Sequence, residues 1–308
     1  DKLLLATGSH PYIPPIDGVQ MNGVSVLRTI ADADAIMAAA KTGVPCVCIG
    51  GGVLGIETAG ALARLGADVT LLESHDWLMP RQLNRKAAAR LEQHMAEIGV
   101  KVLKNARTVA VAGDNQVAGV RLQDGRLVPA GLVILATGVR PNTALARKAG
   151  IEVDTGIVVD NHLRTSAPDV YAAGDVAEHN GQLYGAWAAS QFQGKIAALN
   201  AVGIETAFGG LPRTSVLKLL GIDIASIGKF TADDGSYIIA EDETEDSYAC
   251  LVFHDSRLAG AVLIGHADKA AAVKAAVEQG ANFSRQLNSN VNCRKILAEL
   301  AVGTPPAS

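Results

Sequence analysis

The chain has 308 residues, of which 49% are hydrophobic and 19% are charged, and its formal net charge is −4. Such a length suffices for two or three globular domains with a large buried core, and the composition is typical of a folded protein. The acidic balance argues against nucleic acid as the main partner, because binding phosphate groups requires a basic surface. No apolar run approaches the roughly 18 residues that a membrane span requires, so we expect no membrane insertion.

The first half of the chain predicts strands and helices in alternation. Residues 1–9 read as an apolar strand, a proline-rich loop follows at 10–15, and residues 107–128 alternate apolar and polar positions, as an antiparallel meander does. Helices are expected at 31–40, 53–65 and 84–98, and strands at 44–49, 67–72, 100–103 and 132–136. This succession predicts an α/β fold with a mostly parallel sheet.

The second half predicts shorter strands and then a separate α+β region. A strand at 170–173 precedes a long helix at 186–201. Further strands are expected at 216–220, 224–230, 236–240, 248–254 and 258–265, followed by helices at 267–279 and 293–301. Residues 303–308 are expected to form a mobile tail.

Two apolar runs end in Ala-Thr-Gly, at residues 6–8 and 136–138, and each has a proline three places after the glycine. The second copy follows a glycine fingerprint, Gly-Gly-Gly-Val-Leu-Gly at residues 50–55, which the first copy lacks. The first copy therefore reads as the last strand of another dinucleotide-binding domain, whose opening we expect upstream of Asp1.

The fingerprint follows an apolar strand and opens a helix, which is the context that dinucleotide binding requires. Gly50 permits a tight turn, Gly52 lets the backbone approach a pyrophosphate, and Gly55 lets the helix pack close to the strand. The pyrophosphate would accept hydrogen bonds from the unpaired N–H groups at the start of the helix. The alternative interpretation is a glycine-rich turn in an α/β domain that binds no nucleotide.

Two acidic residues accompany the fingerprint. Glu73 ends the next strand, where a carboxylate can accept hydrogen bonds from both adenosine ribose hydroxyls and repel a 2′-phosphate, so we expect NAD rather than NADP. No arginine precedes Arg81 in this segment. Glu57 lies in the helix, where it either interacts favourably with the helix dipole or lies beside the nicotinamide.

Gly174 and Asp175 follow the strand at 170–173, and an aspartate at a strand end can accept a hydrogen bond from a sugar hydroxyl. In chain order, the first Ala-Thr-Gly is followed by the fingerprint, the second Ala-Thr-Gly and then Gly174-Asp175. With these motifs in this order, the chain resembles the FAD-dependent pyridine nucleotide–disulfide oxidoreductase superfamily. More narrowly, it looks like NADH:rubredoxin reductases, NADH oxidases and the flavin portion of large-subunit nitrite reductases. Members carry an earlier fingerprint for FAD that is absent here, so the FAD domain is expected to be incomplete.

The resemblance implies two cofactors, FAD and NAD, and assigns residues to each. Trp187 begins the helix that would point its N-terminus at the flavin, and it either faces the isoalloxazine or serves simple packing. Glu57 would be the catalytic acid beside the nicotinamide. The other residues expected to contact FAD are Thr7, Gly8, Gly174 and Asp175. Those expected to contact NAD are Gly50, Gly52, Gly55, Glu73 and Gly138.

The resemblance further implies an enzyme, a FAD-dependent NADH:acceptor oxidoreductase that passes hydride from NADH to flavin and electrons on to a second acceptor. A rubredoxin-like protein, oxygen, a small disulfide and a nitrite-reductase metal centre all stay open as that acceptor, and a homodimer is also implied. The alternative is a truncated, flavin-free nucleotide-binding or dimerisation fragment without activity.

The expected architecture is α/β, with Rossmann-like three-layer dinucleotide-binding domains plus a C-terminal α+β domain. The expected bounds are 1–33 for a remnant of the FAD-binding domain, 34–140 for the NAD-binding domain, 141–210 for the second part of the FAD-binding domain and 211–308 for the interface domain. An acidic run at 241–246 is either a solvated hairpin loop or a docking patch. Four cysteines without a Cys-x-x-Cys pair predict buried thiols, a cytoplasmic location and no metal site.

Overall fold

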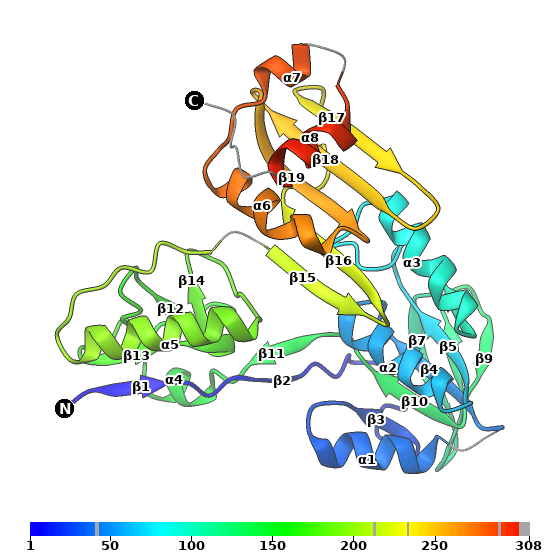
Figure 1. Cartoon of the computed structure of the whole chain (residues 1–308). Coiled ribbons are helices and arrows are strands. Elements are labelled where there is room, and N and C mark those ends of the chain that lie inside the picture. The colour runs from blue at the N-terminus through cyan, green and yellow to red at the C-terminus, as the bar shows by residue number, and fades with distance from the viewer. Residues whose placement is uncertain (41–42, 212–213, 233, 289–290, 302–308) are drawn as a thin grey trace. The chain divides into compact units, whose positions relative to one another are not determined.

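The computed structural model describes residues 1–40, 43–211, 214–232, 234–288 and 291–301 (Figure 1). Contacts divide the chain into two compact units. The first unit joins Asp1–Tyr12 to Gly138–Leu211, and the second joins Ile13–Thr137 to Pro212–Ser308. The tail expected at residues 303–308 lies outside the described residues.

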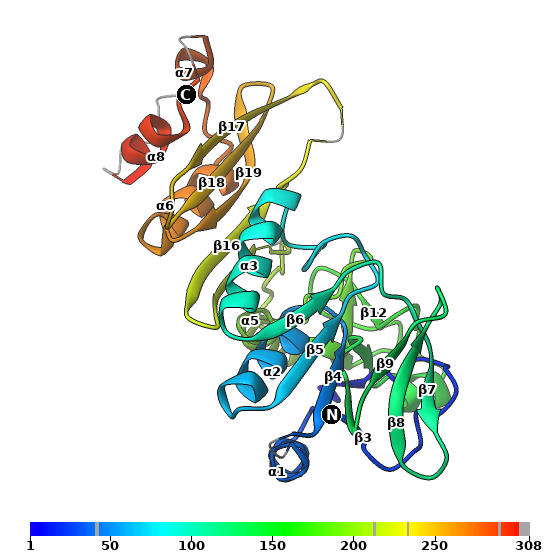
Figure 2. The same cartoon turned by 90° about the vertical axis from the view of Figure 1, so that its right-hand side faces the viewer.

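The second unit contains a five-stranded parallel sheet with the order β3, β10, β4, β5, β6. Cys46 and Cys48 on β4 share a core with residues of helices α1, α2 and α3, whereas Val47 and Ile49 share one with residues of the antiparallel strands β7 and β8. Helices α2 and α3 lie on one side of the sheet and β7 and β8 on the other (Figure 2). The near-continuous apolar run in β4 follows from burial on both faces. The elements are β3 (Val24–Val26), α1 (Ile30–Ala39), β4 (Pro45–Ile49), α2 (Val53–Arg64), β5 (Asp68–Leu72), α3 (Arg85–Glu97), β6 (Val100–Leu103), β7 (Thr108–Gly113), β8 (Val117–Leu122), β9 (Leu127–Pro129) and β10 (Leu132–Leu135).

The helices of this unit differ in how they begin. α1 starts with a capping box between Thr29 and Asp32, and α3 starts at Asn84, whose Oδ1 accepts the N–H of Ala87 at 3.0 Å. The N-cap of α2 is Gly52, which has no side chain to cap the helix. The first-turn N–H groups of α2 are therefore available to a ligand.

The C-terminal part of the second unit is an antiparallel sheet with the order β15, β16, β19, β18, β17. Tyr248 and Ile264 on one face join the core formed by α2 and α3, while Phe253 and Leu263 on the other face pack against helices α6 and α8. The elements are β15 (Thr214–Leu219), β16 (Ile222–Gly228), β17 (Tyr237–Glu243), β18 (Tyr248–His254), β19 (Arg257–Ile264), α6 (Ala267–Glu278), α7 (Ser284–Asn288) and α8 (Cys293–Ala301).

The first unit consists of paired short strands and the long helix α5. β1 pairs with β13 and β12 with β14 in parallel, while β2 and β11 pair antiparallel. Its core includes Ile157, Val176, Ile196 and Phe208. The elements are β1 (Leu3–Leu5), β2 (Ser9–Pro11), β11 (Val139–Pro141), α4 (Ala144–Lys148), β12 (Ile157–Val159), β13 (Val170–Ala172), a 3₁₀ turn (Gly174–Val176), β14 (Ala177–His179) and α5 (Trp187–Ala201).

The structure departs from the sequence-based expectations where elements are short. The single strand expected over residues 1–9 is wrong, because Gly8 has φ +67 and separates β1 from β2. β3, α4 and α7 were not predicted, since three to five residues carry no readable period. Because β3 pairs with β10, part of the expected segment 1–33 lies in the second unit, and the domain bounds themselves stay a prediction.

Candidate functional site

Glycine at three positions shapes the turn between β4 and α2. Gly50 has φ +116, and a Cβ atom there would lie 2.4 Å from the carbonyl oxygen of Ala136. A Cβ atom at Gly55 would lie 1.9 Å from the carbonyl oxygen of Gly50, so a side chain would push the helix off the turn. Apart from Gly52 and its two chain neighbours, no atom of the described residues lies within 4 Å of a Cβ atom placed on Gly52. Gly52, at the uncapped start of α2, is therefore the point at which a diphosphate can approach the backbone.

Glu73 follows β5 and is buried beside this turn. Its Oε2 accepts the N–H of Gly51 at 2.8 Å, and its Oε1 accepts the N–H of His75 at 2.7 Å. The His75 ring and the Ser74 hydroxyl also contact Oε1. Burial acts to raise the pKa of Glu73, but these hydrogen bonds outweigh burial and the pKa lies below its ordinary value. Glu73 is thus a carboxylate at neutral pH, held against the glycine turn.

Glu57 lies on the second turn of α2 and is half-buried. Its Oε1 accepts the N–H of Leu220, in the turn between β15 and β16, at 3.2 Å. Neither the helix-dipole role nor the role beside the nicotinamide predicted this contact with the C-terminal sheet. The catalytic role of Glu57 stays a prediction, but its carboxylate has a defined partner.

In the first unit, Gly174 and Asp175 follow β13, and residues from three segments meet there. Gly174 has φ +83, and its N–H donates to Oε1 of the buried Gln193 at 2.8 Å. Asp175 accepts hydrogen bonds from the hydroxyls of Ser9 at 2.9 Å and Ser190 at 3.4 Å. Ser9 and Gln193 were not predicted; the available signal was the position of Ser9 directly after the first Ala-Thr-Gly.

Each Ala-Thr-Gly motif forms hydrogen bonds with the segment that follows the other motif. The Thr7 hydroxyl donates to the Asn142 carbonyl at 2.8 Å, and the Asn142 amide group donates to the Thr7 carbonyl at 2.7 Å. The N–H of Asn142 also donates to the carbonyl of Gly8, and Gly138, with φ +101, accepts the N–H of Tyr12. Thr7, Gly8 and Gly138 therefore belong to the first unit, whereas the glycine fingerprint belongs to the second.

Trp187 is the first residue of α5 and is 78% exposed. Its side chain therefore makes little packing contact within the described residues, and the choice between simple packing and a position against the flavin stays a prediction. The N-cap of α5 is Ala186, which offers no side-chain hydrogen bond, so this helix also begins uncapped. Within the described residues, an exposed indole ring therefore lies at a helix start that has no side-chain cap, where a ligand can approach.

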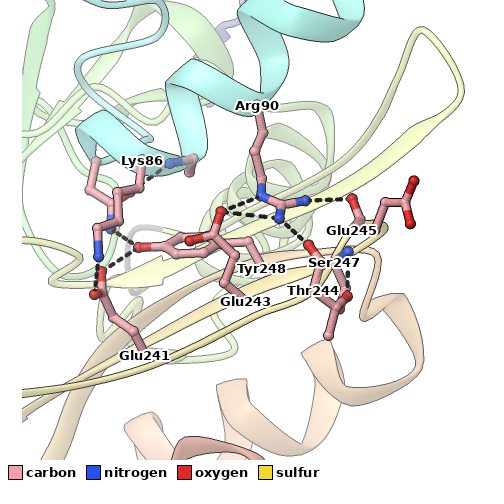
Figure 3. Close-up of polar contacts among 10 residues, drawn as sticks. Lys86, Arg90, Glu241, Glu243, Thr244, Glu245, Ser247 and Tyr248 are labelled. Atoms are coloured by element: carbon pink, nitrogen blue, oxygen red, sulfur yellow. Dashed lines mark hydrogen bonds and ion pairs between the residues drawn. The ribbon is translucent and has the colours of Figure 1, made fainter.

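The acidic run at 241–246 pairs with cations of α3 (Figure 3). Lys86 forms an ion pair with Glu241, Arg90 forms one with Glu243 at 3.0 Å, and Arg90 also donates to two backbone carbonyls in the turn that follows. Residues 241–243 belong to β17. Residues 244–246 are exposed and lie between β17 and β18, so the solvated hairpin-loop interpretation holds for them and is wrong only for the three residues in β17. The ion pairs leave less charge for a docking patch.

Tyr248 connects the same hairpin to the start of α3 (Figure 3). Its buried hydroxyl accepts a hydrogen bond from the Asn84 amide at 2.9 Å and donates one to Oε1 of Glu241 at 2.7 Å. Burial raises the pKa of Tyr248, so the hydroxyl stays neutral. The residue that caps α3 is thereby fixed by the C-terminal sheet.

All four cysteines are free and buried. Burial raises the pKa of Cys48 to about 12, of Cys250 to about 11 and of Cys293 to about 12, and it raises the pKa of Cys46 as well. Thiols that stay protonated are poor nucleophiles. Within the described ranges, no cluster of His, Cys, Asp and Glu is arranged for a metal ion, and no helix is long and apolar enough to cross a membrane.

A parallel sheet with an open glycine turn and an acid ending the next strand defines a dinucleotide-binding α/β protein. The family model for pyridine nucleotide-disulphide oxidoreductases matches residues 1–194, and the model for the rubredoxin NAD+ reductase C-terminal domain matches residues 214–281. The chain belongs to the pyridine nucleotide-disulphide oxidoreductase family. The resemblance inferred from the motifs is confirmed.

Individual relatives agree with this assignment. A nitrite reductase [NAD(P)H] of Bacillus subtilis (strain 168) is 37% identical over 286 residues, covering 92% of this chain and 36% of the relative. The structure of an NAD-dependent persulfide reductase from A. fulgidus matches with a TM-score of 0.87 and 27% identity over 98% of this chain and 63% of that one. NADH:rubredoxin oxidoreductase from Clostridium acetobutylicum matches with a TM-score of 0.78 and 27% identity, over 97% of this chain and 74% of that one.

These matches confirm the predicted fold class, Rossmann-like α/β domains followed by a C-terminal α+β domain. The chain spans about a third of the length of the first curated relatives that it matches.

Proposed function

We propose that this chain carries the NADH site and part of the FAD site of a FAD-dependent NADH:acceptor oxidoreductase. The observation that carries the proposal is the open backbone at Gly52, at the uncapped start of α2, with Glu73 held ionised against the same turn. Family membership and relatives described as using NAD(P)H support it.

On the NADH side, the first-turn N–H groups of α2 would donate hydrogen bonds to the pyrophosphate, and Gly52 leaves room for it. Glu73 would accept hydrogen bonds from the adenosine ribose and repel a 2′-phosphate, so NADH is preferred to NADPH. Ser74 and His75, which follow Glu73, are exposed and uncharged or weakly basic, and neither supplies the fixed positive charge that a 2′-phosphate needs.

On the FAD side, Asp175 would accept a hydrogen bond from the ribityl chain, with Thr7, Gly8 and Gly174 lining the approach of the cofactor. The uncapped start of α5 would place a partial positive charge near the flavin, and Trp187 would cover part of its ring system. Bound together, the two cofactors supply hydride donation and hydride acceptance; the protein supplies binding, orientation and charge.

The second acceptor in this proposal is a redox protein or an attached metal centre. The match of the C-terminal part to the rubredoxin NAD+ reductase domain supports this choice. The four buried thiols of the chain itself are unsuited to accept electrons as a reactive disulfide.

A homodimer through the edge strand β17, where Ile238 and Ile239 are 43% and 47% exposed, completes the proposal and is tested by analytical ultracentrifugation.

Anaerobic titration with NADH tests the function. We expect calorimetry to detect NADH binding, with NADPH much weaker, and in the flavin-loaded protein we expect NADH to bleach the flavin absorption. A protein that neither carries flavin nor binds NADH in calorimetry would instead fit the flavin-free fragment and overturn the proposal.

A further inference from the structure

The turn between β15 and β16 places a leucine in a costly backbone conformation. Leu220 and Gly221 form a two-residue hairpin loop, and their φ angles are +52 and +98. Such a loop favours asparagine or aspartate followed by glycine, because other side chains rarely adopt positive φ. Strain of this kind persists where the surroundings hold the residue in place.

Helix α2 supplies those surroundings with three residues of one face. The N–H of Leu220 donates to Glu57 at 3.2 Å, and the Leu220 carbonyl accepts a hydrogen bond from Arg64 at 2.8 Å. The Leu220 side chain is 4% exposed and packs against Gly60. A Cβ atom at Gly60 would lie 2.3 Å from Cδ2 of Leu220. Residues at i, i+3 and i+7 share a helix face, so Glu57, Gly60 and Arg64 together receive the turn.

We propose that Leu220 is a positioning residue for Glu57. Because Gly60 has no side chain, the Leu220 side chain can pack against the helix there. This packing holds the turn in its strained conformation, and the turn then donates its Leu220 N–H to the Glu57 carboxylate. The C-terminal sheet thereby sets the orientation of an acid on the helix whose first turn is proposed to bind NADH. This inference rests on the proposed function, because Glu57 matters to the reaction only if NADH binds at that turn.

Positioning implies thermodynamic coupling between the turn and the NADH site, and coupling is reciprocal. NADH that orders the first turn of α2 therefore slows amide hydrogen exchange at Leu220. A turn that merely packs against the helix does not respond to NADH in this way.

The test is amide hydrogen exchange of the full chain with and without NADH, in the wild type and three variants. We expect NADH to slow exchange at Leu220 by about three- to tenfold in the wild type. Gly60→Ala fills the space in which the Leu220 side chain packs, and Leu220→Asn suits the turn but removes the apolar side chain. In both variants we expect the amide hydrogen exchange rate at position 220 to rise about five- to tenfold and the response to NADH to disappear. Gly194→Ala is the matched control, because Gly194 lies within α5 with nothing within 4 Å of its Cβ position, and it should behave as the wild type.

A second measurement separates positioning from binding. In the flavin-loaded protein, Gly60→Ala and Leu220→Asn should slow flavin reduction at saturating NADH by about tenfold while the Kd for NADH changes less than about twofold. Leu220→Met, which keeps an apolar side chain, should restore the wild-type rate.

The outcomes are distinguishable. If NADH protects the amides at Gly52 but leaves Leu220 unchanged in the wild type, the positioning role is overturned and the proposed function stands. If NADH protects neither segment and calorimetry detects no binding, the proposed function fails.

Discussion

The two strand-end regions of this chain are assembled differently. At the Gly50–Gly55 turn, the strand, the glycine turn, the helix and Glu73 come from one continuous stretch within the second unit. At Gly174 and Asp175, the contacting groups come from Ser9, Ser190 and Gln193, which belong to other segments of the first unit. The first region is a local motif, so its geometry follows from its own sequence, whereas the second depends on how separate segments are brought together.

We predict the largest effect for substitutions in the glycine turn, which test whether its geometry follows from its own sequence. Gly55→Ala places a Cβ atom 1.9 Å from the Gly50 carbonyl and should cost about 2–3 kcal/mol of unfolding free energy and weaken NADH binding about 100-fold or more. Gly52→Ala, with nothing within 4 Å, should leave the Tm unchanged and weaken NADH binding about tenfold. Thermal unfolding and calorimetry measure both, and wild-type binding by Gly55→Ala would contradict the role of the turn.

A cofactor swap tests whether Glu73 alone sets the preference of this local motif. The double variant Glu73→Ala, Ser74→Arg removes the repelling carboxylate and adds a guanidinium, so the ratio of NADH to NADPH affinity should fall about 100-fold. Glu73→Gln, which keeps an acceptor for the Gly51 N–H, should lose part of the discrimination without unfolding. If NADPH affinity does not rise in the double variant, the ribose assignment of Glu73 is wrong.

Trp187→Ala tests the dispersed region. Because the side chain is 78% exposed, the unfolding free energy should change by no more than about 0.5 kcal/mol, while FAD affinity falls about tenfold. Trp77 is the control tryptophan: it is partly buried in the second unit and donates to the Leu83 carbonyl at 3.0 Å. Trp77→Ala should lower the free energy of unfolding by about 2–3 kcal/mol and leave the FAD affinity unchanged. Equal losses of FAD affinity in the two variants would count against a flavin contact for Trp187.

The smallest predicted effect concerns pH and the first unit. His179 is buried, its Nε2 lies 2.8 Å from Oδ1 of Asn161, and its Nδ1 has no hydrogen-bond partner within the described chain. Burial lowers its pKa, so the unfolded chain binds this proton more readily than the folded one. The contribution of neutral His179 to the free energy of unfolding is therefore complete above about pH 6.5 and declines as the pH falls below that value.

His179→Gln should make this decline between pH 7 and about pH 5 shallower, measured by denaturant unfolding at each pH. An unchanged slope in His179→Gln would show that another group governs the pH response.

The contrast between local and dispersed regions also explains what the sequence could predict. The fingerprint glycines, Glu73 and the strand end at Asp175 were found because each has a recognisable neighbourhood of its own. The contacts between Glu57 and Leu220, Asn84 and Tyr248, and Ser9 and Asp175 join residues 163, 164 and 166 positions apart. No periodicity or spacing reports such partners, since they depend on tertiary packing. The cation pairing of the acidic run was missed for the same reason.

The burial of all four native thiols has a practical consequence for spectroscopy. A cysteine introduced at an exposed site, such as Leu65 in the second unit or Val202 in the first, would react with a maleimide or spin label while the native thiols stay unmodified. Two such labels, one in each unit, would record the distance between the units in solution, with and without NADH, in a protein that keeps its own cysteines.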